Sequence, residues 1–514
     1  MENVQKNQCF SQARELFEDI ICWLNSESVY GLQHSDLEKN LWTNGNELLR
    51  RLLQGYLDSR QEDEIEEECL GIDEEKRTHK LHHSRLLMTI FGEVTVNRIG
   101  YGGRKITSLH PLDGEFNLPA EKYSHGLAEK VSQPVAFNGF DRTEELIKEN
   151  TGGKIPKRQL EELTHKSAVD FELFYEAQQK QDLGKKTGEL MVLTMDGKGV
   201  VMRKEDLREN TKIRAKNSEN KLKKRLSKGE KSNSKRMATV AAVYTIDPWV
   251  RTPQDIINKK ESQNQTAPKP VAKRVWASLE KEPETVMEEM FAEAICRDIN
   301  KEKKWVALVD GNKTQLRLLQ KLAKKEKIEL TIILDLIHVI EYLWKAAYVF
   351  YAPSSQEAEN WVTKQLGYIL EGKSSDVARS MRTCATKKKL TPEQRIGVDK
   401  CATYLVNNKA YLKYDYYLAQ GFPLATGVIE GACRHLVKDR MDITGARWSL
   451  KGAEAILRLR SLCVSGDWKE YWQFHLNQEC QRNHRDLYKG GIPLLKKVSS
   501  ARCSTLIPPK LIIV

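Results

Sequence analysis

Residues 188–203 read GELMVLTMDGKGVVMR, a buried-strand pattern that is interrupted at a carboxylate. The apolar run stops at Asp196, two glycines follow within three residues, and the chain is apolar again at Val200. Asp-Gly is a common turn pair, so one interpretation is the tip of a hairpin. The other is a strand that delivers a carboxylate to a functional site. The choice depends on whether other carboxylates follow strands in the same way.

The segment from Met191 to Asp335 alternates between strand and helix patterns. Five apolar runs predict strands at 191–195, 238–246, 274–279, 304–310 and 328–335. Two amphipathic segments, 282–299 and 313–327, predict helices before the fourth and fifth strands. This order predicts an α/β sheet that begins with a meander, which is the order of the ribonuclease-H-like fold.

Two of these predicted strands end in the same dipeptide. VLTMDGKG places Asp196 after the first strand, and VALVDGNK places Asp310 after the fourth. These strands are neighbours in a ribonuclease-H-like sheet, so both carboxylates are expected at one sheet edge. Adjacent carboxylates repel unless one is protonated or a divalent cation lies between them. Oxygen ligands without cysteine or histidine favour Mg²⁺ or Mn²⁺ over zinc.

A third acid is available in residues 423–441, PLATGVIEGACRHLVKDRM. Glu430 lies in the middle of a predicted helix, where a glutamate is ordinarily a solvated surface charge. The small neighbours Gly427, Gly431 and Ala432 instead favour a close approach of this helix to the sheet. We therefore expect Glu430 to be buried at the site.

The C-terminal part of the sequence resembles a known family. Residues 427–462, GVIEGACRHLVKDRMDITGARWSLKGAEAILRLRSL, are similar to the signature of ISKra-group transposases of bacterial insertion sequences, which are DDE enzymes akin to the Mutator-like superfamily. The resemblance extends to VLTMDGKGV, WVALVDGNKTQ, IILDLIHVIEYLW, the predicted FGEVTVNRIGY hairpin and the helix pair before Asp196. It covers most of residues 85–475.

The resemblance implies an enzyme that binds the terminal inverted repeats of an insertion sequence and catalyses metal-dependent DNA cleavage and strand transfer. Asp196, Asp310 and Glu430 match the catalytic acids, which hold two Mg²⁺ (or Mn²⁺) ions in two-metal phosphoryl transfer. Asp335 and His338 match an Asp-x-x-His element that follows the second acid. Asp335 also ends an apolar strand and is the alternative second acid. The Lys/Arg-rich insert after Asp196 departs from the family pattern.

Basic and aromatic residues near these acids are candidates for contact with DNA. Arg434 and Lys438 follow Glu430 at helical spacing and are expected to share its face, although Arg434 could equally form a salt bridge with Glu430. His338 could orient a phosphate or simply pack. Trp448 could stack on an unpaired base or lie in the core. The remaining candidates here are Lys198 and Arg447.

Two further segments are expected to contact DNA. Residues 141–153 and 154–169 predict a helix, a glycine turn and a second helix that opens with Lys157 and Arg158, as in a helix-turn-helix. Two ordinary packed helices fit these residues equally well. Residues 212–236 are dense in lysine and arginine, so we expect them to order against the DNA backbone. Within this stretch, the candidate DNA-contacting residues are Lys223, Lys224 and Arg225.

Five parts of the chain are predicted from these patterns. They are an N-terminal helical region at 1–84, a β-hairpin and helix-turn-helix-like DNA-binding region at 85–187, a ribonuclease-H-like catalytic domain at 188–335 and 421–475, an all-helical insertion at 336–420, and a C-terminal tail at 476–514. The hairpin is expected to turn near Gly92.

The composition excludes several classes of protein. The 514 residues carry a formal net charge of +12, which favours a nucleic-acid partner. The ten cysteines form no C-x-x-C pair, which argues against a disulfide framework. No signal-peptide pattern opens the chain, and charged residues interrupt its longest apolar stretch. We expect a cytoplasmic, nucleoid-associated protein without a membrane span, acting on double-stranded DNA as a homodimer or higher homo-oligomer.

Two other functions are alternatives to a transposase. A phosphatase of the haloacid type needs Asp-x-Asp after its first strand, and DGKG at 196–199 has no second acid. A catalytically inactive, domesticated DNA-binding protein on the same fold is the alternative, against which the three intact acids argue.

Overall fold

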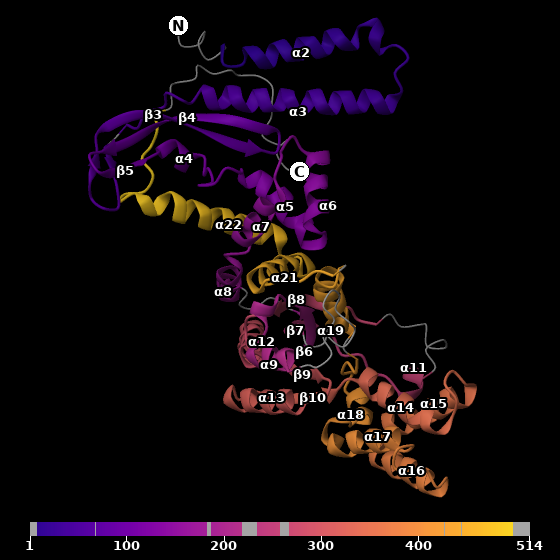
Figure 1. Ribbon diagram of the computed structural model, residues 1–514. Coiled ribbons are helices and arrows are strands. Elements are labelled where there is room, and N and C mark those ends of the chain that lie inside the picture. Colours follow the sequence, from indigo (N-terminus) through magenta and orange to yellow (C-terminus); the bar gives the residue numbers. More distant parts are fainter. Residues whose placement is uncertain are drawn as a thin grey trace. The chain divides into compact units, whose positions relative to one another are not determined.

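The computed structural model describes residues 8–66, 68–181, 187–217, 234–257, 267–425, 427–443 and 445–496. The chain divides into two compact units (Figure 1). One unit contains the chain up to Asp170 together with the segment from Lys469, and the other contains Phe171–Trp468. Residues 476–496 therefore belong to the first unit, whereas the sequence predicted a tail from residue 476.

The first unit contains two long helices and a three-stranded antiparallel sheet. These are α2 (Ser11–Leu24), α3 (His34–Asp58), β3 (His79–Thr89), β4 (Gly92–Gly103) and β5 (Ile106–Leu109). The predicted hairpin is confirmed, with its turn just before Gly92. The predicted boundary after residue 84 is wrong, because it falls inside β3. The first half of that strand is mostly exposed and polar, so it carries no apolar alternation.

The C-terminal segment is held in the first unit by buried polar contacts. The Tyr471 hydroxyl donates to the Ser167 carbonyl at 2.6 Å. Asp170 accepts from Arg482 Nη1 at 2.8 Å and lies 2.6 Å from His475 Nδ1. The other elements of this unit are η1 (Glu27–Val29), β1 (Cys69–Leu70), β2 (Lys76–Arg77), α4 (Pro111–Glu115), α5 (His125–Phe137), α6 (Phe140–Asn150), α7 (Lys157–Ser167), α22 (Trp468–Asn483) and η5 (Arg485–Leu487).

A five-stranded mixed sheet forms the centre of the second unit, and all five predicted strands are present. They are β6 (Leu190–Val201), β7 (Lys235–Ile246), β8 (Val271–Ser278), β9 (Lys304–Val309) and β10 (Leu330–Leu334). Their order in space is β10-β9-β6-β7-β8. The pairs β6–β7 and β7–β8 are antiparallel, while β6–β9 and β9–β10 are parallel. The first and fourth strands are therefore neighbours, as predicted.

Helices pack on the sheet and bury its central strands. Residues 190–195 of β6 are all buried, which explains why this run is continuously apolar instead of alternating. α12 (Pro283–Arg297) packs on β6 and β7, and α21 (Leu450–Ser465) packs on β8. α19 (Gly427–Ala432), which carries Glu430, also packs on β6 and β7. The sheet thus supplies the rigid base on which the acidic residues are placed.

Between Asp335 and α19, every regular element of the described residues is helical, as predicted. These elements are α14 (Leu336–Phe350), α15 (Gln356–Leu370), α16 (Ser374–Lys387), α17 (Ile396–Asn407), η3 (Lys409–Tyr411) and α18 (Tyr414–Ala419). The remaining elements of the unit are α8 (Phe171–Gln181), η2 (Lys204–Asp206), α9 (Glu209–Lys216), α11 (Pro253–Ile257), α13 (Lys313–Lys325), the π-helix η4 (Cys433–Lys438) and α20 (Asp439–Met441).

Lys223, Lys224 and Arg225 lie outside the described residues. At the end of their predicted DNA-contacting stretch, Arg236 lies in β7 and donates from Nε to the Leu279 carbonyl at 2.8 Å. That side chain is therefore engaged within the protein. In the parts of the chain that the structure describes, no helix combines the length and the apolar character that crossing a membrane requires.

Candidate metal centre

Asp196 lies inside β6 rather than at its end. Pairing with β7 continues through Asp196↔Val240 as far as Val201, so the hairpin-tip interpretation is wrong. The parallel neighbour β9 pairs with β6 only up to Thr194↔Leu308. Asp196 therefore lies two residues beyond the last residue of β6 that pairs with β9, where β9 no longer runs beside β6. The sequence pattern did not predict that the strand continues, because two glycines, which have low strand propensity, follow Asp196.

Both carboxylate oxygens of Asp196 have partners within the protein. Oδ1 accepts from the backbone N–H of Gly197 at 2.6 Å. Oδ2 accepts from Cys433 Sγ at 3.3 Å. Burial is the main cause that holds the pKa of the Cys433 thiol well above its ordinary value, and the negative charge of Asp196 raises it further. Cys433 is thus a protonated donor that orients Asp196, and nothing in the sequence pattern identified this role.

Asp310 follows the last residue of β9 and lies in a tight turn. Its Oδ1 accepts from the Asn312 backbone N–H at 3.0 Å, and Asn312 in turn caps α13. Gly311 has φ of +89°, a left-handed conformation that favours glycine. A Cβ at this position would lie 3.2 Å from Leu334 Cδ2. The glycine after Asp310 therefore serves the backbone of the turn.

Asp335 follows β10 in the same way but has a different environment. Its side chain caps α14, with Oδ1 accepting from the Ile337 backbone N–H at 2.9 Å, and the residue is only 1% exposed. Oδ2 lies 3.4 Å from His338 Nδ1, one turn into the helix. This contact with Asp335, with smaller contributions from Asp310 and Glu341, raises the pKa of His338 to about 9 against the opposing effect of burial.

Glu430 completes a group of three potential metal ligands. Among the described residues, one such group is found, and it consists of Asp335, His338 and Glu430, whose ligand atoms all lie within 4.8 Å of one another. Partial burial raises the pKa of Glu430, and the charges of Asp335 and Asp196 raise it further while His338 lowers it. Two carboxylates and an imidazole, from the residue after β10, from α14 and from α19, therefore converge.

The structure does not bring the predicted triad of Asp196, Asp310 and Glu430 together in this way. Asp196 and Asp310 join no such ligand group in the described chain. Each has one oxygen bonded to a backbone N–H of its own segment. Both remain near enough to act electrostatically, Asp196 on Glu430 and Asp310 on His338. Asp335, predicted as the alternative acid, is the aspartate that meets Glu430.

The prediction that small residues bury Glu430 is also wrong. Glu430 is exposed, and a Cβ added at Gly427 or Gly431 would meet no atom within 4 Å. The helix instead packs through its apolar residues Ile429 and Ala432, which are buried. Burial of an apolar face alone is enough to present the opposite, acidic face to the site.

The helix after Glu430 widens into a π-helix, η4, and this changes which residues share its face. A π-helix forms i→i+5 instead of i→i+4 hydrogen bonds and has more residues per turn, so Lys438 no longer follows Glu430 at α-helical spacing. Buried Arg460 donates from Nε to the Leu436 carbonyl at 2.7 Å and also bonds the His435 carbonyl. Arg460 thereby satisfies carbonyl groups of the widened turn. No sequence pattern indicates this positioning role.

The other predicted DNA-contacting residues near the site have different environments. Trp448 is buried, its indole N–H donates to the Met441 carbonyl at 3.0 Å, and the Arg440 guanidinium lies 4.8 Å from its ring centroid. Stacking on a base is therefore contradicted, and the core alternative is correct. In the described chain Arg434 forms no ion pair with Glu430. The exposed or half-exposed candidates whose DNA contacts remain predictions are Lys198, Arg434, Lys438 and Arg447.

Lys157 and Arg158 belong to the first unit, at the start of α7. The predicted helix pair is present as α6 and α7. Lys157 pairs with Asp141 at 2.6 Å, and Arg158 pairs with Glu162 at 3.5 Å. All four side chains are substantially exposed, so these pairs are weak and compatible with rearrangement on a ligand. Contact with DNA stays a prediction for both residues.

The donor set fits a single divalent cation. Ligand atoms on opposite sides of one Mg²⁺ ion lie about 4.2 Å apart, so a group whose ligand atoms all lie within 4.8 Å of one another needs at most a small contraction. Carboxylate oxygens suit Mg²⁺ and Mn²⁺, and the imidazole of His338 widens the choice toward later transition metals. Because the pKa of His338 is about 9, ligation by its ring at neutral pH must release a proton.

Comparisons with known proteins assign no family to the chain. No protein-family model and no curated protein matches it. Among solved structures, a chain of the Drosophila P element transposase strand transfer complex is similar over 67% of this chain and 79% of its own length. The sequence identity is 10% and the TM-score is 0.25, which is too low to establish a common fold.

Proposed function

We propose that this protein is a metal-dependent DNA transposase that cleaves DNA and transfers strands with a centre built from Asp196, Asp310, Asp335 and Glu430. The observation that carries the proposal is the convergence of Asp335, His338 and Glu430 within 4.8 Å, at the end of a parallel strand and on a distant helix. Acidic groups gathered in this way repel one another, and a divalent cation would relieve that repulsion.

The sheet supports a ribonuclease-H-like assignment for the second unit. A meander of β6, β7 and β8, followed by parallel strands β9 and β10 on the other side of β6, is the arrangement expected of that fold. The acidic residues follow β9 and β10 or lie on β6 beyond the end of β9. Function in α/β sheets commonly resides at the carboxyl ends of parallel strands.

A divalent cation at this centre, Mg²⁺ or Mn²⁺, would neutralise charge on a phosphate and lower the pKa of a water molecule. Asp335 and Glu430 are the residues placed to hold it. Asp196 and Asp310 lie near enough to act electrostatically on Glu430 and His338, so we propose them as the further carboxylates of the centre. His338, protonated through its contact with Asp335, is placed to donate a hydrogen bond to a phosphate oxygen when it does not ligate metal.

The experiment is strand cleavage of a supercoiled plasmid that carries the inverted repeats flanking the coding region. Wild type is expected to nick or linearise it with Mg²⁺ or Mn²⁺ and not with EDTA. Asp335→Asn and Glu430→Gln should abolish cleavage, whereas Glu329→Gln, which neutralises an exposed acid away from the centre, should not. Cleavage that survives both substitutions would remove these acids from the mechanism.

A catalytically inactive DNA-binding protein is the second candidate. It is favoured by the engagement of Asp196 and Asp310 with their own backbone instead of with the ligand group. In that case wild type would bind the repeats in a gel-shift assay and leave the plasmid intact in either metal. Retention of Mn²⁺ binding without cleavage would identify the centre as structural.

A further inference from the structure

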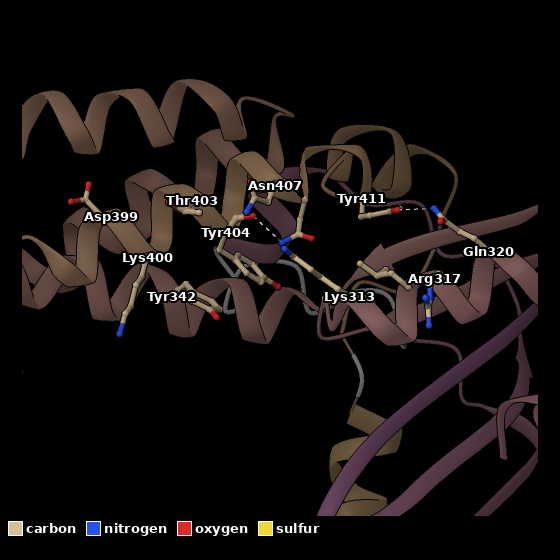
Figure 2. A pocket seen from close by; sticks show the side chains of 13 residues that line it. Lys313, Arg317, Gln320, Tyr342, Asp399, Lys400, Thr403, Tyr404, Asn407 and Tyr411 are labelled. Carbon is tan, nitrogen blue, oxygen red and sulfur yellow. Dashed lines mark hydrogen bonds between the residues drawn. The ribbon is translucent and has the colours of Figure 1, made fainter. Parts of the chain in front are cut away.

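We propose that a cleft between α13 and α17 binds the phosphodiester backbone of a nucleic-acid strand that leads to Asp310. This inference deepens the proposed function and rests on it, because it assigns a strand path to the same centre. The cleft has a volume of about 660 Å³. Its lining includes Lys313, Arg317 and Gln320 of α13 on one side and Lys400, Thr403 and Asn407 of α17 on the other (Figure 2).

The cleft carries three cations that form no ion pair with the described residues, although the pKa of Glu284, lowered mainly by Lys321, is lowered further by the charge of Arg317. Lys313, Arg317 and Lys400 are exposed, and none forms an ion pair with any residue that the structure describes. The one acid of the lining, Asp399, is already held by Arg395 at 2.7 Å and lies 3.8 Å from Arg382. Three free positive charges on facing helices therefore favour an anionic ligand that spans the cleft.

Neutral groups add hydrogen-bonding capacity between these cations. Gln320 donates to the Tyr411 hydroxyl at 2.8 Å, which leaves that hydroxyl able to donate outward. The Asn407 side chain is exposed at the cleft. Phosphate oxygens accept from hydroxyl and amide donors as well as from lysine and arginine. The lining is thus suited to the phosphates of a nucleic-acid backbone.

The cleft adjoins the turn that carries Asp310. Gly311, the residue after Asp310, lines the cleft. The Tyr404 hydroxyl, also in the lining, donates to the Asp310 carbonyl at 3.1 Å. The Tyr404 ring stacks on Tyr342 with centroids 4.1 Å apart and an interplanar angle of 15°, which gives this end a rigid aromatic wall. A strand held by Lys313 would therefore pass directly to Asp310.

Exposed cations that contact phosphates predict a defined salt dependence. Each phosphate contact on a single strand changes the slope of log K against log salt by about 0.7, so three contacts contribute about 2. Removing them should weaken binding about tenfold or more at low salt and flatten the slope by that amount. Folding should be preserved, because the three side chains are exposed and unpaired.

The test compares two charge-matched triple variants of the full-length chain. Lys313→Gln/Arg317→Gln/Lys400→Gln removes the cleft cations, and Lys324→Gln/Lys364→Gln/Lys387→Gln removes three exposed lysines elsewhere in the same unit. Fluorescence anisotropy of a labelled single-stranded oligonucleotide is measured from low to high salt. The cleft variant alone should bind about tenfold more weakly with a flatter slope. Lys313→Arg/Arg317→Lys/Lys400→Arg should restore binding.

Equal losses in the two triple variants, or no loss in either, would overturn the inference. Inorganic triphosphate as a second probe separates a nucleic-acid backbone from a free phosphate anion. If the cleft variant loses affinity for triphosphate but not for the oligonucleotide, the cleft binds a free anion and the proposed strand path is wrong. Plasmid cleavage by wild type separates this result from the proposed function. Metal-dependent cleavage with no cleft-specific binding loss would overturn the cleft alone, and a cleft-specific loss without cleavage would retain the cleft and reject the transposase.

Discussion

The ends of β9 and β10 carry aspartates that look alike in sequence and differ in the structure. Each follows an apolar parallel strand. Asp310 turns its Oδ1 to the Asn312 N–H in a glycine turn, whereas Asp335 is buried, caps α14 and meets His338 and Glu430. The residue after each aspartate decides this difference. Gly311 permits a left-handed turn, and Leu336 begins a helix directly.

This contrast teaches that an apolar strand ending in aspartate predicts where a carboxylate lies but not what it contacts. A helix cap holds its carboxylate in place through a backbone N–H and keeps the second oxygen free for other groups. Asp335 uses its second oxygen on His338. The following predictions test the contrast between the two strand ends.

The largest expected difference is in metal affinity. Asp335→Asn should weaken Mn²⁺ binding by at least about 100-fold, because it removes a carboxylate that is directly placed to ligate. Asparagine caps helices as well as aspartate does, so the fold should persist. Asp310→Asn should weaken binding less than tenfold, since Asp310 lies outside the ligand group. Titration calorimetry with Mn²⁺ measures both, and equal losses would contradict the contrast.

The pKa of His338 provides the second test, in the metal-free protein. Its folded pKa of about 9 lies above the ordinary 6.5, so its stabilising effect is fully present below pH 6.5 and is lost as the pH rises through about 9. Asp335→Asn should return the pKa toward 6.5, while Asp310→Asn should lower it only slightly, because the contact with Asp335 is the main cause. NMR titration of the imidazole resolves the two variants, and a similar fall in both would show that the two aspartates act alike.

The turn after Asp310 predicts a smaller effect on stability. Gly311→Ala should destabilise the protein by about 1–2 kcal/mol, because alanine is strained at positive φ and its Cβ would crowd Leu334. Gly427→Ala is the control: it has open space and lies in a helix, so it should be neutral or stabilising by up to about 1 kcal/mol. Urea unfolding measures both. A neutral Gly311→Ala would mean that the turn does not need glycine.

The smallest expected effect concerns the hydroxyl that supports the Asp310 turn. Tyr404→Phe removes a hydrogen bond to the Asp310 carbonyl and should cost about 1 kcal/mol in the free energy of unfolding. Tyr411→Phe removes only an exposed contact with Gln320 and should cost less. Thermal unfolding of the two variants against wild type compares them. Equal costs would indicate that Tyr404 is not specifically coupled to the turn.

Much of the fold follows from local pattern. Continuous apolar runs identified all five strands of the second unit, since strands buried on both faces need no polar alternation. The pattern failed where burial was partial: the exposed half of β3 gave no apolar signal, and the glycines of β6 interrupted the apolar run before Val200. In the same way, the open space around Gly427 and Gly431 shows that small residues near Glu430 did not indicate close packing.

Local pattern was enough to predict the strands, the helical segment between Asp335 and Glu430 and the aspartates that follow apolar runs, because these depend on periodicity and on where each apolar run ends. Which acids meet depends on packing between distant segments. The packing of α19 on β6 and β7 brings Glu430 to Asp335, and backbone N–H groups engage Asp196 and Asp310. Such contacts join residues far apart in the chain, and their geometry is set by packing and by hydrogen bonds that no local pattern encodes.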